Sequence, residues 1–355
     1  MIKSKQPPPH PNNPLQTWTE AATQELNGAN PFEKLSIRKE DLIIQPYYKK
    51  TDKNQVDFIL PASDSKIYGA RAWQNIAEVL VTDEKTANTR ALHYLSTGAD
   101  GILFVINQIG LNLPALLAGI AVEDCAVSLL LDAGCESEAG RYLDFAKNKN
   151  LTGCIFYRQS TQVIYHKSLS ANFVTCGIYF NPDKNPVNEL VQALGAGVAL
   201  MDKLTNQGLS AQAIAAQVGF CVSIDSDFFV SIAKLKALRI LWNTVLTAYG
   251  VSGAVQIHAI STSWTKDSFQ PHGNLIKSTT AALAAIVGGC NYLTVQPESE
   301  NEPGNRAARL VSAVLREESH LSKVADPTAG SYYLASLIEQ LVDKSWQQFL
   351  TNLYA

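Results

Sequence analysis

The sequence has little of what several protein classes require. Only 17% of its 355 residues are charged and the net charge is −3, so it lacks the basic stripe of an electrostatic nucleic-acid binder. No apolar run reaches the roughly 18 residues that a membrane-spanning helix needs. The charged, proline-rich start has no apolar stretch and does not resemble a secretory signal. The six cysteines show no C-x-x-C spacing, and free cysteine in apolar runs behaves as a small hydrophobe. We therefore expect a reduced, cytoplasmic protein without a metal site.

What the sequence does contain is a series of short apolar runs from residue 101 onward. Continuous apolar runs bounded by turn residues are typical of strands buried on both faces of a parallel sheet. The runs lie at 101–107, 126–132, 153–157, 173–180, 219–225, 254–260 and 291–295, with an eighth expected at 322–326. Helical segments are expected between most of them, at 136–149, 188–208, 228–249, 274–288 and 305–320.

Eight strand-then-helix units predict a (β/α)8 TIM barrel, with a doubly wound open sheet as the second possibility. The connection from Tyr157 to Phe173 is short for a crossover helix, so we expect one outer helix to be trimmed.

The N-terminal part has a different pattern. The first fifteen residues are rich in Pro and Asn and are expected to be disordered, or ordered only against a partner. Residues 17–28 predict a short amphipathic helix that ends on Asn-Gly, and residues 31–50 predict extended strands. We expect an N-terminal, partner-wrapping extension at 1–70, a barrel at 71–345 and the start of a C-terminal linker at 346–355.

Polar residues after the strands are the candidates for chemistry, because TIM-barrel active sites lie on the loops at the carboxyl ends of the strands. These residues are Asn107, Asp132, Arg158, Asp225, His258, Gln296 and Asp326. Their spacing matches no metalloprotease, Walker A, nucleophile-elbow or Rossmann motif. Arg158 and His166 are more often loop residues than catalysts. The residues alone therefore leave the site unspecified.

Two segments resemble signatures of the methylmalonyl-CoA mutase family. They are the helix from Asp227 to Trp242 and the turn Asp326-Pro-Thr-Ala-Gly-Ser-Tyr-Tyr333. The segments 31–35 and 45–48 resemble the entry to the family's barrel, and the resemblance extends over nearly the whole chain from Trp18. It implies a TIM barrel whose catalytic members run radical chemistry on acyl-CoA with adenosylcobalamin.

The resemblance also implies that the chemical residues are missing. At the family's tyrosine, arginine, histidine, arginine, glutamine and His-Thr-Asn positions this chain has, in order, Glu78, Ile76, Ile178 or Phe180, Gln256, Ile260 and Thr294. Apolar side chains cannot donate hydrogen bonds to a developing charge. Only His258 survives, and with Gln296 and Asp326 it would form a vestigial pocket. We expect no catalytic residue here, and a barrel interior blocked by Ile178 or Phe180, Ile260 and Leu293.

Cobalamin-binding members carry a C-terminal domain with an Asp-x-His-x-x-Gly loop. No histidine of this chain lies in that pattern, so we expect no C-terminal cobalamin-binding domain and no cofactor bound by this chain. The resemblance implies the small, non-catalytic (beta) subunit of a heterodimeric mutase of propionate metabolism, with adenosylcobalamin in the large catalytic subunit. A homodimer in isolation stays open. Two other functions also stay open: an active acyl-CoA mutase of altered substrate range, and a stand-alone acyl-CoA-binding barrel.

Overall fold

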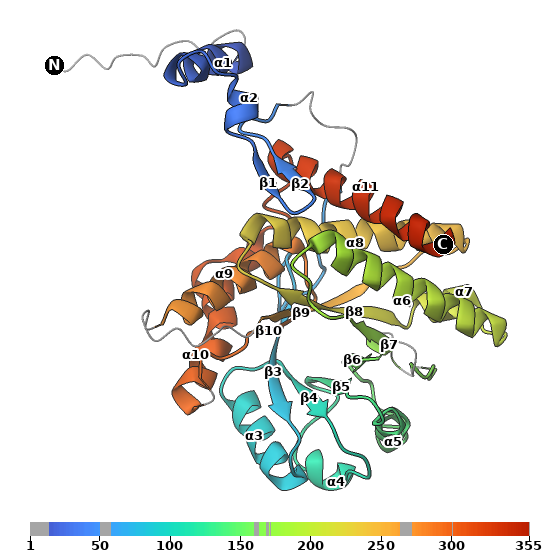
Figure 1. Cartoon of the computed structure of the whole chain (residues 1–355). Helices are drawn as coiled ribbons and strands as arrows, with labels where there is room; N and C mark the ends of the chain where they lie inside the picture. Colours follow the sequence, from blue (N-terminus) through green and yellow to red (C-terminus); the bar gives the residue numbers. More distant parts are fainter. Residues whose placement is uncertain are drawn as a thin grey trace.

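The body of the molecule is a closed barrel of eight parallel strands wrapped by helices (Figure 1). The computed structural model describes residues 14–49, 58–159, 163–167, 170, 172–262, 272–299 and 301–354. The strand order is β10-β3-β4-β5-β6-β7-β8-β9, and β9 pairs with β10 to close the circle. The predicted (β/α)8 fold is confirmed, and the open-sheet alternative is wrong. The strands are β3 (Gln74–Leu80), β4 (Gly101–Ile106), β5 (Ala126–Leu131), β6 (Gly153–Tyr157), β7 (Phe173–Tyr179), β8 (Val218–Ile224), β9 (Gln256–Ser261) and β10 (Tyr292–Thr294).

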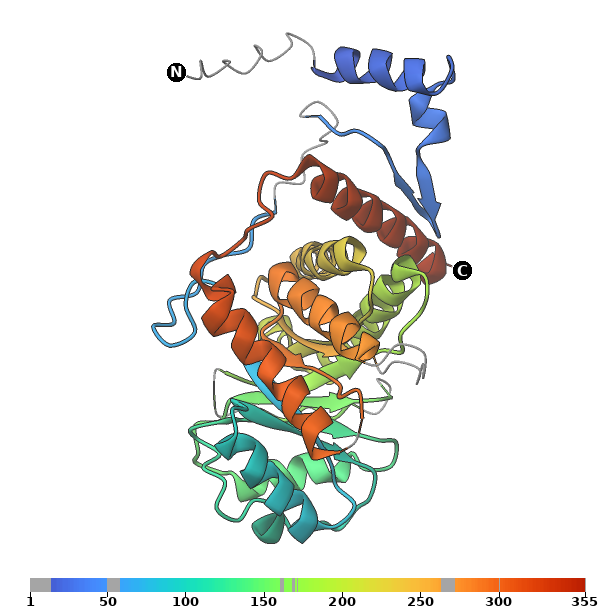
Figure 2. The same ribbon diagram turned by 90° about the vertical axis from the view of Figure 1, so that its left-hand side faces the viewer.

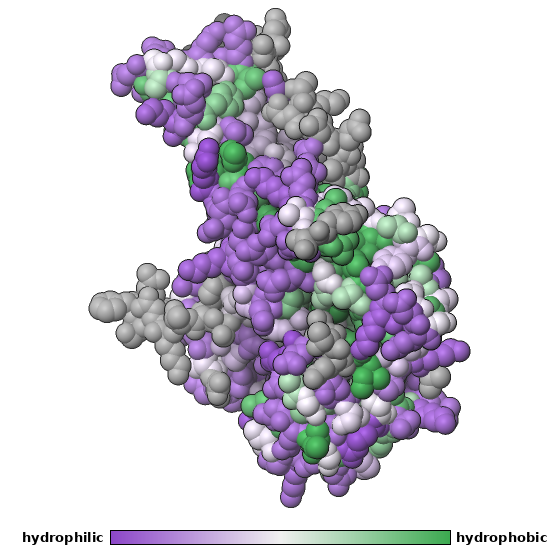
Figure 3. Space-filling model, turned by 45° about the vertical axis from the view of Figure 1, so that its right-hand side comes forward, coloured by the Kyte–Doolittle hydropathy of each residue, from purple (hydrophilic) through white to green (hydrophobic). Residues whose placement is uncertain are grey.

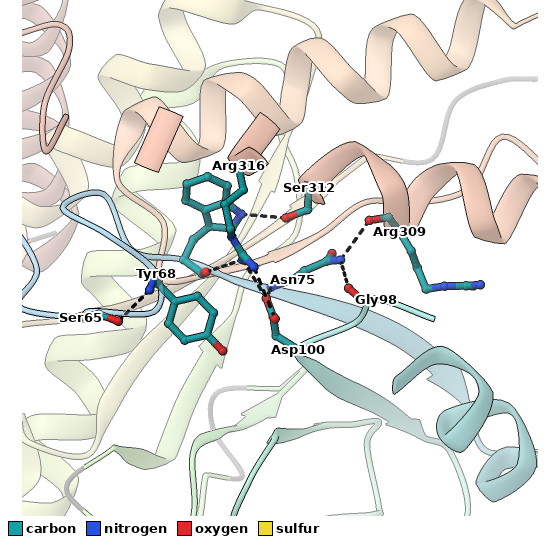
Figure 4. A network of polar contacts seen from close by, with 9 residues as sticks. Ser65, Tyr68, Asn75, Gly98, Asp100, Arg309, Ser312 and Arg316 are labelled. Carbon is teal, nitrogen blue, oxygen red and sulfur yellow. Dashed lines mark hydrogen bonds and ion pairs between the residues drawn. The ribbon is translucent and has the colours of Figure 1, made fainter. Parts of the chain in front are cut away.

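The eighth strand is not where the sequence pattern placed it. The run 322–326 overlaps a short 3-10 turn, Leu321–Lys323, and β3 completes the barrel instead. The polar residues of β3 hide it from an apolar-run search. Asn75 can be buried without a free polar donor because its side-chain amide donates to the carbonyl oxygens of Gly98 and Arg309, at 2.9 and 3.0 Å. Figure 4 shows this network, in which Asp100 also accepts from the Asn75 amide and from Arg316.

The outer layer consists of helices whose starts are capped by short polar side chains. Asp83, Asp227 and Asn301 each accept a hydrogen bond from an amide in the first turn of the helix that follows, which satisfies an otherwise orphaned donor. Among the described residues between β6 and β7 there is no helix, whereas the short connection predicted a trimmed one. The helices are α3 (Glu84–Ser96), α4 (Leu113–Leu116), α5 (Ser137–Phe145), α6 (Pro186–Asn206), α7 (Ala211–Ala215), α8 (Phe228–Ala248), α9 (Gly273–Gly288) and α10 (Glu302–Ala313), which continues as a π turn over Val314–Glu318.

Two separate apolar clusters make up the core. The larger lies between the strands and the helices, and the smaller fills the barrel lumen with side chains that include Phe156 and Tyr292. Ile260 lies in the lumen as predicted, but Ile178, Phe180 and Leu293 belong to the outer cluster. The prediction that these three block the lumen is therefore wrong. Side chains alternate along a strand, so β7 points Tyr179 inward and Ile178 outward.

The N-terminal extension forms an arm outside the barrel. It contains α1 (Pro14–Glu25), α2 (Pro31–Lys34) and an antiparallel hairpin of β1 (Ile37–Lys39) and β2 (Leu42–Ile44). The predicted helix is present at 14–25. Of the segment 31–50, predicted as strands, residues 37–39 and 42–44 are strands, but residues 31–34 form a helix capped by Asn30. The disorder expected for the first fifteen residues falls almost wholly on 1–13, outside the described residues. Figure 2 shows the arm beside the C-terminal helix α11 (Tyr332–Tyr354).

The hairpin docks on α11 through polar contacts. Gln340 accepts a hydrogen bond from the amide of Ile43 at 2.9 Å and donates one to its carbonyl oxygen at 3.0 Å. Lys344 donates to the carbonyl oxygen of Asp41. The expected domain boundaries stay a prediction, and residue 346 falls inside α11. Among the described residues, none of the helices combines the length and hydropathy that a bilayer span requires.

Candidate functional site at the barrel mouth

Asp132 and Arg158 meet at the carboxyl ends of neighbouring strands, as TIM-barrel geometry requires. Arg158 Nε lies 2.5 Å from Asp132 Oδ1, and both side chains are a little over one-third exposed. The Arg158 guanidinium also lies over the ring of Tyr179, 4.9 Å from its centroid. Both charges are therefore already paired within the mouth.

Glu78 and Gln296 form a second polar pair at the same end of the barrel. The side-chain Nε2 of Gln296 donates to Glu78 Oε2 at 2.9 Å, and the backbone amide of Gln296 donates to Ser261 Oγ at 2.8 Å. Burial raises the pKa of Glu78, while the hydrogen bond from Gln296 and the charge of Arg158 oppose that rise. The carboxyl group thus lies in a half-buried setting that resists ionisation.

His258 lies deeper, inside the lumen. Its Nε2 is 2.8 Å from Thr294 Oγ1, and its Nδ1 has no partner among the described residues. The rings of Phe156 and Tyr292 lie with their centroids 5.6 and 5.8 Å from the imidazole. The residue has no exposed surface, and burial lowers its pKa to about 3. At neutral pH it is an uncharged, sealed imidazole that cannot shuttle protons to the mouth.

Asp326 lies apart from the mouth. Both of its oxygens accept from Lys236 Nζ, at 2.8 and 2.7 Å, and Oδ2 also accepts from the Leu60 amide at 3.0 Å. The two charged side chains are 2% and 1% exposed. This buried ion pair ties the turn that follows Val324 to α8. The structure therefore joins Asp326 to an anchor of the outer layer and not to His258 and Gln296.

The remaining predicted residues have varied surroundings. Asp225 accepts from the Asp227 amide at 2.8 Å, near a buried Lys234–Glu189 ion pair that sequence reasoning missed. Asn107 is exposed. Of the family positions, Ile76 and Ile260 line the lumen, Thr294 is buried, and Gln256 is partly exposed at the start of β9. Sequence reasoning also missed Tyr179, whose inward direction follows from strand alternation.

The mouth does not fit a cobalt cofactor through its own side chains. Imidazole nitrogen is a common ligand for such metals, but the lumen imidazole of His258 is fully buried. Of the described polar groups at the mouth, Arg158 is paired with Asp132 and Gln296 with Glu78. Among the described residues, no group of three or more His, Cys, Asp or Glu side chains is arranged to hold a metal ion.

Comparison with known proteins shows which family the chain is similar to. A family model described as methylmalonyl-CoA mutase matches residues 181–351. A protein named "Methylmalonyl-CoA mutase small subunit" from Porphyromonas gingivalis is 26% identical over 95% of this chain and 62% of its own length. Over these residues the chain is similar to the methylmalonyl-CoA mutase family.

Two further relatives carry similar names. A small subunit from Streptomyces virginiae is 35% identical over 48% of this chain and 29% of its own length, and a probable small subunit from Mycobacterium tuberculosis is 28% identical over 77% and 51%. The chain thus spans about three fifths or less of each of these curated relatives. The resemblance predicted from the signature segments is confirmed. Among solved structures, a Yersinia pestis DHPS chain covers 74% of this chain at 13% identity and a TM-score of 0.38, which is too low to bear on function.

Proposed function

We propose that this chain is the non-catalytic small subunit of a heterodimeric methylmalonyl-CoA mutase. Its large partner subunit would hold adenosylcobalamin and interconvert methylmalonyl-CoA and succinyl-CoA. The observation that carries the proposal is the state of the barrel mouth, where Arg158 pairs with Asp132 and Gln296 with Glu78, while His258 is sealed. A catalytic site needs hydrogen-bond donors aimed at the charge that develops in the transition state. The donors of Arg158 and Gln296 are instead bound to Asp132 and Glu78.

The lumen supports the same function. Apolar Ile76 and Ile260 line it together with Phe156 and Tyr292. Such a lumen is a packed core, as in most TIM barrels, rather than a channel with polar groups for a thioester. The chain would then contribute shape and stability to the complex. All six cysteines are free and five of them are buried, which fits a reducing compartment such as the cytoplasm.

The N-terminal arm is the surface we assign to the large subunit. Trp18 packs against Phe32 and Tyr47, with ring centroids 5.5 and 5.2 Å apart, so these half-buried aromatics contact one another within the arm. Figure 3 shows the arm as a lobe that stands off the barrel body, with apolar patches among hydrophilic residues. Aromatic residues are enriched at protein interfaces, and stable heteromeric interfaces bury roughly 2,000 Å² or more.

Co-purification with a tagged large subunit tests the proposal. We expect a stable heterodimer by mass photometry, and turnover of methylmalonyl-CoA only when the large subunit is present. No complex at micromolar concentration, with a fully active large subunit alone, contradicts it. Turnover by this chain alone with adenosylcobalamin would support the alternative of an active mutase. Binding of acyl-CoA by the isolated chain without any partner would support the stand-alone module.

A further inference from the structure

A groove in the side of the barrel has no role in the proposed function. Strands β3 and β10 pair only at Gln74–Tyr292 and Asn75–Leu293, so the two strands separate before their carboxyl ends. Beside this seam lies a groove of about 320 Å³. Its floor comes from β3 and from Val295 to Pro297, and its walls come from α3 and α10. This volume lies within the range of small-molecule sites.

Each wall presents two polar side chains spaced four residues apart, which places them on one helix face. Arg90 and Tyr94 come from α3, and Asn305 and Arg309 come from α10. The Arg309 guanidinium lies 4.2 Å from the centroid of the Tyr94 ring. Figure 4 shows the Arg309 side chain extending away from the network that holds its carbonyl oxygen. The four residues therefore surround one end of the groove.

Arg309 is incompletely satisfied for a buried charge. Its side chain is 5% exposed, and Nη2 lies 3.0 Å from Glu302 Oε1. That oxygen is shared with His93 Nε2, also at 3.0 Å. Nε and Nη1 of Arg309 have no partner among the described residues. A buried donor without a partner is destabilising, so an additional acceptor here would be stabilising.

Two other groups at this end of the groove are free. Arg90 is exposed, and its guanidinium makes no hydrogen bond or ion pair that the described part of the chain shows. The side-chain amide of Asn305 also makes no hydrogen bond that the described part of the chain shows. At this end two arginines and Glu302 leave one net positive charge, which suits a monoanion better than a dianion, and burial raises the pKa of the Glu78 carboxyl group at the other end. At the other end of the groove lie the hydrogen-bonding groups of Gln296 and Glu78, and apolar side chains also line the groove.

We propose that this groove binds a small carboxylate. Its anionic group would lie against Arg90 and Arg309, and a hydroxyl or amino group on its tail would reach Gln296 and Glu78. The carboxylate oxygens would supply acceptors for the donors that Arg309 and Asn305 leave unpaired. This site does not depend on the large subunit, so it goes beyond the proposed function.

Calorimetric titration of the full chain at constant ionic strength tests the site, with lactate, acetate and inorganic phosphate as probes. We expect lactate to bind more tightly than acetate, because its hydroxyl, next to the carboxylate, adds a hydrogen bond to the Asn305 side-chain amide at the same end, and phosphate to bind most weakly. Arg90→Ala should weaken lactate binding about tenfold, which is about 1.4 kcal/mol, because the variant removes a charge-assisted hydrogen bond to the carboxylate. Arg90 is exposed, so this variant should fold normally.

Arg306→Ala is the matched control. Arg306 is an exposed arginine of α10 next to Asn305 and does not line the groove, so lactate binding should be unchanged. Tighter binding of phosphate than of lactate, no heat with either carboxylate, or an equal loss in the Arg90 and Arg306 variants overturns the proposal. The assay uses this chain alone, so none of these outcomes bears on association with the large subunit.

Discussion

At the scale of single residues, His258 shows how burial changes what a side chain can do. The imidazole is enclosed by aromatic rings and its hydrogen bond to Thr294 leaves Nδ1 unpaired among the described residues. Its pKa of about 3 lies well below the value of about 6.5 expected in the unfolded chain. Between these two values the unfolded chain binds a proton that the folded chain does not bind.

This difference predicts acid sensitivity. The stability that neutral His258 contributes is fully present above about pH 6.5 and is lost by about 1.4 kcal/mol per pH unit as the pH falls toward 3. From pH 7 to pH 5, wild type should therefore lose about 2 kcal/mol more unfolding free energy than His258→Gln. Denaturant titrations at the two pH values measure this difference. The exposed His320→Asn variant should follow wild type, and parallel pH dependence of wild type and His258→Gln would refute the prediction.

At the scale of elements, the contact between α6 and α8 depends on one missing side chain. A Cβ at Gly197 would lie 2.4 Å from the ring of Trp242, which is 1% exposed, whereas a Cβ at Gly195 on the same helix would meet nothing within 4 Å. Gly197→Ala should lower the unfolding free energy by about 1–3 kcal/mol through overpacking. Gly195→Ala should raise it by about 0.5–1 kcal/mol, because alanine favours a helix. Thermal unfolding of both variants measures these changes. Equal shifts in melting temperature would show that α6 can move away from Trp242 to accommodate the added methyl group.

The elements also show what could be predicted from the sequence. The strands from β4 to β10 were identifiable because their apolar runs are continuous and bounded by turns. The five expected helices were identifiable as the segments between these runs. Strand β3 was not, because Asn75 and Glu78 interrupt its pattern, and their partners Gly98, Arg309 and Gln296 are distant in the sequence. Asp132 and Arg158 could be placed at the mouth by strand topology alone. The ion pair between them could not be predicted, because it depends on the side-chain conformations of residues on neighbouring strands.

At the scale of the whole molecule, the aromatic cluster around Trp18 and the hairpin of the arm have different contacts. The ring partners of Trp18 both lie in the arm, whereas the hairpin is held by Gln340 and Lys344 of α11. Removing residues 1–35 should therefore change the unfolding free energy of the barrel by no more than about 0.5 kcal/mol. The same truncation should weaken association with the large subunit at least tenfold.

A pair of point variants separates these two effects. Trp18→Ala should weaken association, while Phe145→Ala, an exposed aromatic of α5, should not. Sedimentation velocity with the large subunit compares the two. Undiminished association of the truncated chain would remove the arm from the interface.

The clasp between the hairpin and α11 has a consequence for synthesis on the ribosome. The hydrogen bonds of Gln340 to Ile43 join segments 297 positions apart, and the ribosome adds only about 5–20 residues per second. The hairpin therefore waits many seconds for its docking site while the barrel strands emerge one after another. During that interval its exposed edges are open to other chains.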